Sequence, residues 1–306
     1  MTGHRESSGS LQSPSFVLYS LHSLSIIELY NTQSLGGIMP EGPEVKRTAE
    51  GLARAMTNKT ITNVEVLTGR YIKEPPGGID DFKASLPIKV VGAGCHGKFI
   101  FALCTNETYL WSTLGMTGYW NSDGGKYERV RLDFSDGSKV YFNDMRNFGT
   151  MKFVKGKHEM MKKLKSLGPD MLAQDVPTHV FKEALMKRPE WSIAKALMKQ
   201  SLVCGVGNYI KADSLWLAKI SPKRKVKDIT DIEFADLNEA IKRVMRTSYE
   251  SGGATIASYQ SFDDQPGSYT QKMVVYGQKK DPEGNDVIKE KTDDGRSTHW
   301  VPKVQK

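Results

Sequence analysis

The feature that most constrains the fold is a change of hydrophobic pattern near residue 155. Before it, short runs rich in β-branched and aromatic residues alternate with turn signals, and after it apolar residues recur at helical spacing. The strand-like runs are 61–67, 88–91, 98–104, 108–111, 129–134, 139–142 and 151–154, and the helical runs are 158–166, 178–187, 190–200, 208–218 and 231–251. Runs of strands followed by runs of helices are typical of an α+β protein with more than one domain.

The segment 39–155 is predicted to be a helix packed on a β-sandwich or barrel. The apolar residues of 45–56 share one helical face, and charged residues occupy the other. Asp136-Gly137 lies between two alternating runs and predicts a hairpin with a tight turn. The layers of this domain are therefore expected to be one helix and β-sheet.

The C-terminal tail turns to strand-like patterns again. Its runs are 273–276, 287–290 and 298–301, with a turn at Asp281-Pro-Glu-Gly284. Lysines and arginines decorate it, and a hairpin of this size cannot hold a core alone. We expect it to dock on the helical domain.

Charge and cysteine content bound the function. The 306 residues include 43 Lys+Arg against 35 Asp+Glu, a net charge of +8, which makes nucleic acid the default partner. No apolar run is long enough for a transmembrane helix, so no membrane partner is expected. The scattered Cys95, Cys104 and Cys204 exclude a disulfide framework and a Cys-rich zinc site. A reducing, intracellular location is therefore expected, either nucleus or cytoplasm according to where a nucleic-acid partner lies.

Residues 1–38 differ from the rest of the chain. They are rich in Ser, with an apolar run from Phe16 to Leu29 and only Arg5 before it, so a secretory signal is not favoured. An organelle presequence, a tail and a misplaced start codon all remain open. Met39 begins a stretch of new character and is a candidate start of the chain.

Several short motifs occur in a fixed order from Met39 onward. They are Met39-Pro-Glu-Gly-Pro-Glu44, His96-Gly-Lys98, Leu114-Gly-Met-Thr-Gly118, Asp144-Met-Arg-Asn-Phe-Gly149, the segment Leu197–Asn208 and Gly295-Arg-Ser-Thr298. In order and spacing they resemble the formamidopyrimidine-DNA glycosylase/endonuclease VIII family. The resemblance implies a bifunctional DNA glycosylase and AP lyase of base excision repair. Such an enzyme would act as a monomer, without a cofactor, on double-stranded DNA that contains oxidised bases or abasic sites.

The resemblance also implies a domain organisation. An N-terminal extension, 1–38, would precede a catalytic β-sandwich domain at 39–155. A DNA-binding domain with a helix–two-turn–helix motif follows at 156–260, and a lesion loop and finger at 261–306. By itself, the glycine-containing connection before residue 208 favours an ordinary helical hairpin.

Pro40 is the expected nucleophile. If Met39 starts the chain and is removed, Pro40 carries a free secondary amine with a pKa of about 8, far below that of lysine. Such an amine can attack C1′ of a nucleotide, expel the base and leave a Schiff base, whereas an amide-bonded proline cannot. The alternative is a proline that only starts a helix.

Four further catalytic residues follow from the resemblance. Glu41 would protonate the opening sugar, and Glu44 would assist, although a helix-capping role suits Glu44 equally. Lys98 would lie beside the lesion phosphate and Arg296 would hold the flanking phosphates, assisting β- and δ-elimination. Taken alone, each cation is an ordinary surface residue.

A damaged base in a duplex must be flipped out before it can be reached. Met116, Arg146 and Phe148 match the family's void-filling residues, and flanking glycines favour loop tips over a core position for them. Asn208 is expected at a helix start, binding a phosphate or capping the helix.

The finger departs from the common family pattern. Most members hold it with four cysteines on zinc, but Val275–Gln305 contains no cysteine, and His299 alone cannot form a zinc site. The chain therefore resembles zincless, endonuclease VIII-like members, and we expect apolar packing to replace the metal. The packing residues would be Val275, Tyr276, Ile288, Trp300 and Val301.

Substrate choice and two rival functions stay open. The finger and the segment 207–213 favour oxidised pyrimidines and hydantoins. Gly252-Gly-Ala-Thr255 and Gln265-Pro-Gly-Ser-Tyr269 resemble a loop that covers oxidised purines. A non-catalytic damage-binding protein is the alternative if Pro40 is never exposed. The second rival function is a structural nucleic-acid module that shares the helix–two-turn–helix motif.

Overall fold

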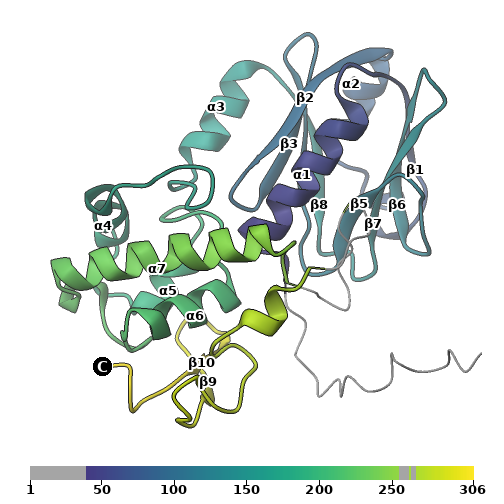
Figure 1. The fold of residues 1–306 in the computed structure, drawn as a ribbon. Coiled ribbons are helices and arrows are strands. Elements are labelled where there is room, and N and C mark those ends of the chain that lie inside the picture. The colour runs from purple at the N-terminus through teal and green to yellow at the C-terminus, as the bar shows by residue number, and fades with distance from the viewer. Residues whose placement is uncertain (1–38, 255–261, 263–266) are drawn as a thin grey trace, which may run out of the picture. The chain divides into compact units, whose positions relative to one another are not determined.

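The computed structural model describes residues 39–254, 262 and 267–306. The predicted N-terminal extension, Thr255, Gln265 and Pro266 lie outside the described residues. Within the described chain the α+β prediction is confirmed, with a strand-rich first part and a helical second part (Figure 1).

The first part is an antiparallel sheet covered by one long helix. Helix α1 (Gly42–Met56) lies along the sheet, whose strand order is β5-β7-β6-β1-β2-β3-β4-β8 (Figure 1). The strands are β1 (Thr60–Val66), β2 (Ile88–His96), β3 (Phe99–Cys104), β4 (Thr108–Thr113), β5 (Gly118–Asn121), β6 (Glu128–Phe134), β7 (Lys139–Asp144) and β8 (Thr150–Lys155). Strands β1 and β2 pair only at Thr60↔Lys89 and Ile61↔Ile88, so the sheet divides there into the two halves of a sandwich.

The amphipathic pattern of α1 explains its place. Val45, Ala49, Leu52 and Met56 are all at most 2% exposed and pack against the inner strand residues. The Asp136-Gly137 hairpin forms as predicted, with Gly137 at a φ of 82° between β6 and β7. The sequence pattern missed β5 and α2 (Ile79–Ala84), which are too short to show a clear period.

The second part is built from helices. They are α3 (Lys157–Lys165), α4 (Thr178–Met186), α5 (Ile193–Leu197), α6 (Asn208–Leu217) and α7 (Asp231–Glu250), with α7 beside α6 (Figure 1). The helix predicted at 190–200 is wrong in length, because Ser192 caps its start by accepting a bond from Lys195 N at 3.1 Å. Past Leu197 the chain turns into the glycine-containing connection that leads to α6.

The finger is a two-stranded hairpin, β9 (Ile288–Lys291) and β10 (Ser297–Trp300), docked on α6 as expected. The strand predicted at 273–276 is wrong. The carboxylate of Asp213 on α6 accepts the backbone N–H groups of this segment, which a strand would give to a neighbour. Of the expected packing residues, Val275, Tyr276, Trp300 and Val301 are buried, but Ile288 is 38% exposed, so its predicted role in the packing is wrong.

Candidate active site

Pro40 lies at the entrance of α1, before the helix starts. Glu41 is the N-cap, and Gly42 and Pro43 form the first turn. Pro43 therefore occupies the position that suits a helix-starting proline. The alternative interpretation, in which Pro40 only starts the helix, is therefore wrong. Pro40 itself is buried.

The Glu41 carboxyl joins α1 to the start of α6. Its Oε1 accepts Tyr209 N at 2.9 Å and its Oε2 accepts Ile210 N at 3.2 Å. These N–H groups belong to the first turn of α6, where the helix dipole favours negative charge. Burial nevertheless raises the pKa of Glu41 to about 7, against the opposing effects of Lys98 and the two N–H donors. A carboxyl with a pKa near neutrality can both give and take a proton there.

Glu44 sits one turn further along α1 and is completely buried. Its Oε2 accepts Glu41 N at 2.9 Å, so the predicted capping role is confirmed. The same carboxyl accepts Tyr209 Oη at 3.1 Å and Ala254 N at 2.7 Å. Burial raises the pKa of Glu44, with these donors opposing it. Glu44 thus ties α1 to α6 and to the loop after α7.

Lys98 occupies the two-residue turn between β2 and β3, one residue before the strand it was expected to open. Burial lowers the pKa of its ammonium, and the Glu41 carboxylate opposes that shift. Gly97 has a φ of 57°, and a Cβ there would lie 2.5 Å from Cys204 Cβ. The turn that carries Lys98 thus packs closely against Cys204 and Gly205 of the helical part.

Arg296 reaches this region from the finger. Its Nη1 contacts Met39 Sδ at 3.4 Å, although 257 residues separate the two in sequence. Asn208, the first residue of α6, donates from Nδ2 to Ser297 O at 2.9 Å. Asn208 is therefore not the N-cap, which is Gly207, and its side chain holds the backbone beside Arg296.

The expected void-filling residues come together on two neighbouring loops. Arg146 Nη1 lies 3.4 Å from Met116 Sδ, and the Arg146 guanidinium lies 5.0 Å from the centre of the Phe148 ring. Phe148 is 55% exposed. The predicted loop positions are confirmed.

A buried aspartate, which the sequence reasoning missed, joins these two loops. Asp144 Oδ1 accepts Arg146 N at 3.2 Å and the Thr117 hydroxyl, and its Oδ2 accepts Gly149 N at 2.7 Å. Asp144 is 1% exposed. The aspartate that begins Asp144-Met-Arg was the available signal, since a carboxylate ending a strand often binds loop N–H groups.

Tyr209, Lys211 and Asp213 were missed as well. All three are buried polar residues on α6, a helix whose other side chains are largely apolar. A lysine and an aspartate within an apolar helical run are the signal that could have identified them, because buried charges require partners.

Neither a metal cluster nor a membrane span is found in the described part of the chain. No group of three or more His, Cys, Asp or Glu residues is placed to hold a metal ion there. No described helix is long and apolar enough to cross a membrane.

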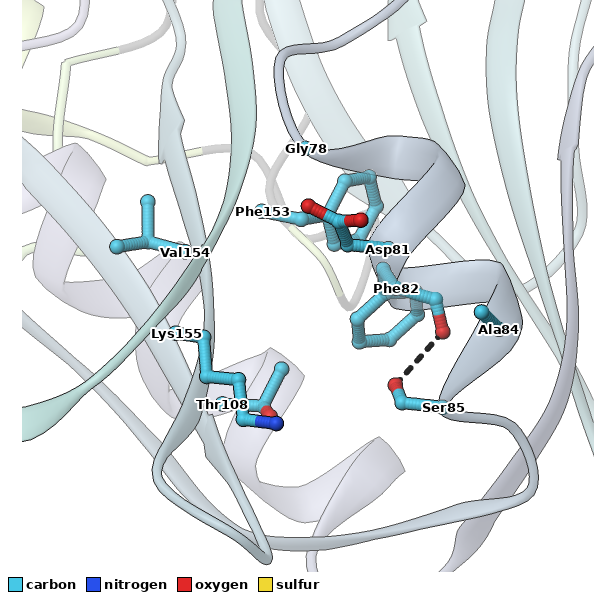
Figure 2. Close-up of a pocket in the computed structure, with 9 residues that line it drawn as sticks. All are labelled: Gly78, Asp81, Phe82, Ala84, Ser85, Thr108, Phe153, Val154 and Lys155. Carbon is cyan, nitrogen blue, oxygen red and sulfur yellow. Dashed lines mark hydrogen bonds between the residues drawn. The ribbon is translucent and has the colours of Figure 1, made fainter.

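One pocket lies apart from the predicted site residues, between α2 and the strands β4 and β8 (Figure 2). Its volume is about 430 Å³. Phe82 and Phe153 stack there with ring centres 4.3 Å apart, and Ser85 Oγ donates to Phe82 O at 2.7 Å. No predicted catalytic or DNA-binding residue lines it.

The β-sandwich, the helix–two-turn–helix and the docked hairpin define the class of DNA glycosylases with AP lyase activity. The family models that match are the formamidopyrimidine-DNA glycosylase N-terminal domain at 39–151, its H2TH domain at 167–260 and its C-terminal domain at 265–306. The chain belongs to the formamidopyrimidine-DNA glycosylase family.

Relatives and solved structures agree with this assignment. The formamidopyrimidine-DNA glycosylase of Oceanobacillus iheyensis is 34% identical, covering 87% of this chain and 98% of the relative. That of Shouchella clausii is 31% identical, covering 87% and 99%. The Lactococcus lactis Fpg bound to abasic-site DNA has a TM-score of 0.77 at 25% identity, covering 87% and 99%. The Thermus thermophilus MutM (Fpg) protein has a TM-score of 0.77 at 27% identity, covering 87% and 98%.

Proposed function

We propose that the protein removes oxidised bases from double-stranded DNA through a Schiff base on Pro40 and then cuts the strand by β,δ-elimination. The observation that carries the proposal is the convergence on residues 39–41 of groups from three elements. Lys98 comes from a β-hairpin turn, Arg296 from the finger, and the first turn of α6 binds Glu41. A nucleophile, a proton carrier and phosphate-binding cations are what this chemistry requires.

The proposed steps follow from the chemistry of these groups. The Pro40 nitrogen attacks C1′ and the C1′–N bond to the base breaks, so that the base leaves with the bond electrons and takes up a proton. The Pro40 nitrogen then loses its proton and forms a double bond to C1′, while the C1′–O4′ bond breaks and Glu41 delivers a proton to the ring oxygen. The resulting iminium acidifies the 2′ proton, whose removal expels the 3′ phosphate. A second elimination expels the 5′ phosphate, with Lys98 and Arg296 stabilising the phosphate charges.

This chemistry requires Pro40 to carry a free amine, so the residues before it must be absent from the active form. We propose that 39–155 supplies the catalytic groups and that 156–260 and 261–306 supply the DNA-binding helices and a zincless finger. Met116, Arg146 and Phe148 would fill the gap left by the flipped nucleotide, with Asn208 supporting the phosphate contact.

For substrate we propose oxidised pyrimidines and hydantoins, on the strength of the zincless finger. The alternative, oxidised purines, is favoured by the names of the relatives and by a Lactococcus lactis Fpg mutant bound to Fapy-dG DNA. The wild-type Lactococcus lactis protein also binds oxidised-pyrimidine DNA, which is compatible with the first choice. An excision panel of thymine glycol, hydantoins and 8-oxoguanine separates the two.

The test of the mechanism is covalent trapping. Protein that begins at Pro40 is incubated with an abasic-site oligonucleotide and borohydride, beside the 306-residue chain as the acylated control. We expect an adduct only with the free proline, and lower turnover for Pro40→Gly and Glu41→Gln. Absence of an adduct with the free terminus refutes the lyase mechanism. Lesion-specific binding without an adduct would support the damage-binding alternative, and binding without lesion preference would support a structural nucleic-acid module.

A further inference from the structure

Helix α6 contacts the finger region through four polar side chains. The contacts are Asn208 Nδ2 to Ser297 O at 2.9 Å, Lys211 Nζ to Asp294 Oδ2 at 2.6 Å, Asp213 Oδ1 to Tyr276 N at 3.0 Å and Trp216 Nε1 to Asp281 Oδ2 at 3.2 Å. A single helix thus holds a finger that has no cysteine.

The Lys211–Asp294 contact is an ion pair, and both of its side chains are almost completely buried. The side chain of Lys211 is 0% exposed and that of Asp294 is 3% exposed. A second ion pair in the same region, Lys280–Asp286, has the same 2.6 Å separation, but its side chains are 59% and 80% exposed. Burying a charge pair carries a large desolvation cost, so such a pair is weak evidence for stability and better evidence for a fixed geometry.

The geometry that the pair fixes is that of the loop carrying Arg296. Asp294 binds Lys211 through Oδ2, while its Oδ1 accepts Arg296 N at 3.1 Å and the Thr292 hydroxyl at 2.6 Å. Thr292 N in turn donates to Arg296 O at 3.0 Å, and its hydroxyl lies 2.7 Å from that of Thr298. Both backbone polar groups of Arg296 are therefore held by residues that Lys211 anchors.

We propose that Lys211 is a positioning residue for Arg296. Acting through Asp294, it positions the loop at the tip of the finger. The Arg296 guanidinium then lies beside Met39, the residue before Pro40. Lys211 itself does not touch the reacting atoms. The inference rests on the proposed role of Arg296 in binding the lesion phosphates.

The test measures whether Lys211 acts through Arg296. Protein beginning at Pro40 is prepared as Lys211→Met, Arg296→Ala and the double variant, and binding to an abasic-analogue duplex is measured. Because a charge-assisted phosphate contact is lost in each, we expect each single variant to bind about tenfold more weakly. The double variant should bind about as weakly as Arg296→Ala alone, because one contact is removed twice. Asp286→Asn, which breaks the exposed pair, is the control and should bind normally.

The inference is overturned if the double variant loses as much binding as the product of the two single losses. Normal binding by Lys211→Met overturns it as well. If Lys211→Met does not fold, Thr292→Val, which keeps the ion pair and removes the hydroxyl bridge, should show the same non-additivity with Arg296→Ala. Independent losses there overturn the inference equally. If Arg296→Ala binds normally while borohydride trapping persists, the inference falls and the Pro40 mechanism stands. If trapping fails in the parent protein, it is the mechanism that falls.

Discussion

Replacing Glu41 with Gln should change how the stability of the protein depends on pH. Burial raises the pKa of this carboxyl from 4.5 to about 7. The folded protein therefore holds the proton more tightly than the unfolded chain. The stabilisation from this tighter proton binding is complete below pH 4.5 and is lost as the pH rises toward 7. Glutamine cannot ionise, so the variant lacks this part of the pH dependence.

The magnitude follows from two opposing effects. One pKa unit corresponds to about 1.4 kcal/mol, so the shift makes the unfolding free energy of the parent protein fall by about 3 kcal/mol over that range. An amide has a single oxygen acceptor, so either Tyr209 N or Ile210 N loses its partner, at a cost of about 1–3 kcal/mol. Glu41→Gln should thus be the less stable protein near pH 4.5, and its deficit should shrink or reverse by pH 8.

Urea unfolding of both proteins at a series of pH values from 4.5 to 8, followed by tryptophan fluorescence, measures the difference. Glu190→Gln is the matched control. Lys227 and Lys225 lower the pKa of this exposed carboxyl, so its difference should be small and opposite in sign. A Glu41→Gln difference that stays constant within about 1 kcal/mol across the range would refute the raised pKa.

Three further outcomes are expected. Phe148→Ala should change stability by less than about 0.5 kcal/mol, because the ring is 55% exposed, while weakening binding to lesion DNA in a gel-shift titration; equal loss for undamaged DNA would contradict a void-filling role. Gly97→Ala should lower the melting temperature, since its Cβ would meet Cys204 Cβ at 2.5 Å at a positive φ; an unchanged melting curve would contradict the close packing of this turn. Prolonged dialysis against EDTA should leave the melting temperature unchanged, because 275–305 contains no cysteine; a fall would reveal a structural metal.

Local patterns were enough to predict most of the fold. The α1 face from Val45 to Met56 and the Asp136-Gly137 turn depend on neighbours in sequence, and the structure confirms both. The segment 273–276 was mistaken for a strand because its apolar residues fit one. What decides its conformation is Asp213, about 60 residues away, which takes its N–H groups. Ile288 was misplaced for a similar reason, since hydrophobicity alone does not tell which face of a two-stranded hairpin is covered.

The candidate site divides in the same way. Short motifs predict the site residues Pro40, Glu41, Lys98 and Arg296. No motif predicts that Arg296 contacts Met39. That contact depends on how the finger docks, to which both buried apolar residues and the buried polar residues of α6 contribute. Their partners come from distant segments, so the sequence pattern signals that a partner exists without telling which one it is.

The helix–two-turn–helix therefore has a second task besides any contact with DNA. The first turn of α6 binds the Glu41 carboxyl through two N–H groups. In the glycine-containing connection before α6, Gly205 O accepts a hydrogen bond from Gly42 N at 2.9 Å. A Cβ on Gly207 would lie 2.1 Å from Glu41 Cδ, so only glycine allows this approach without displacement. The same turns that are expected to hold phosphate thus fix the position of the Glu41 carboxyl, and their N–H groups oppose the rise in its pKa that burial causes. A change in how the helical part binds DNA should therefore also alter the pH dependence of the reaction that we propose at Pro40, as measured by strand cutting at a series of pH values.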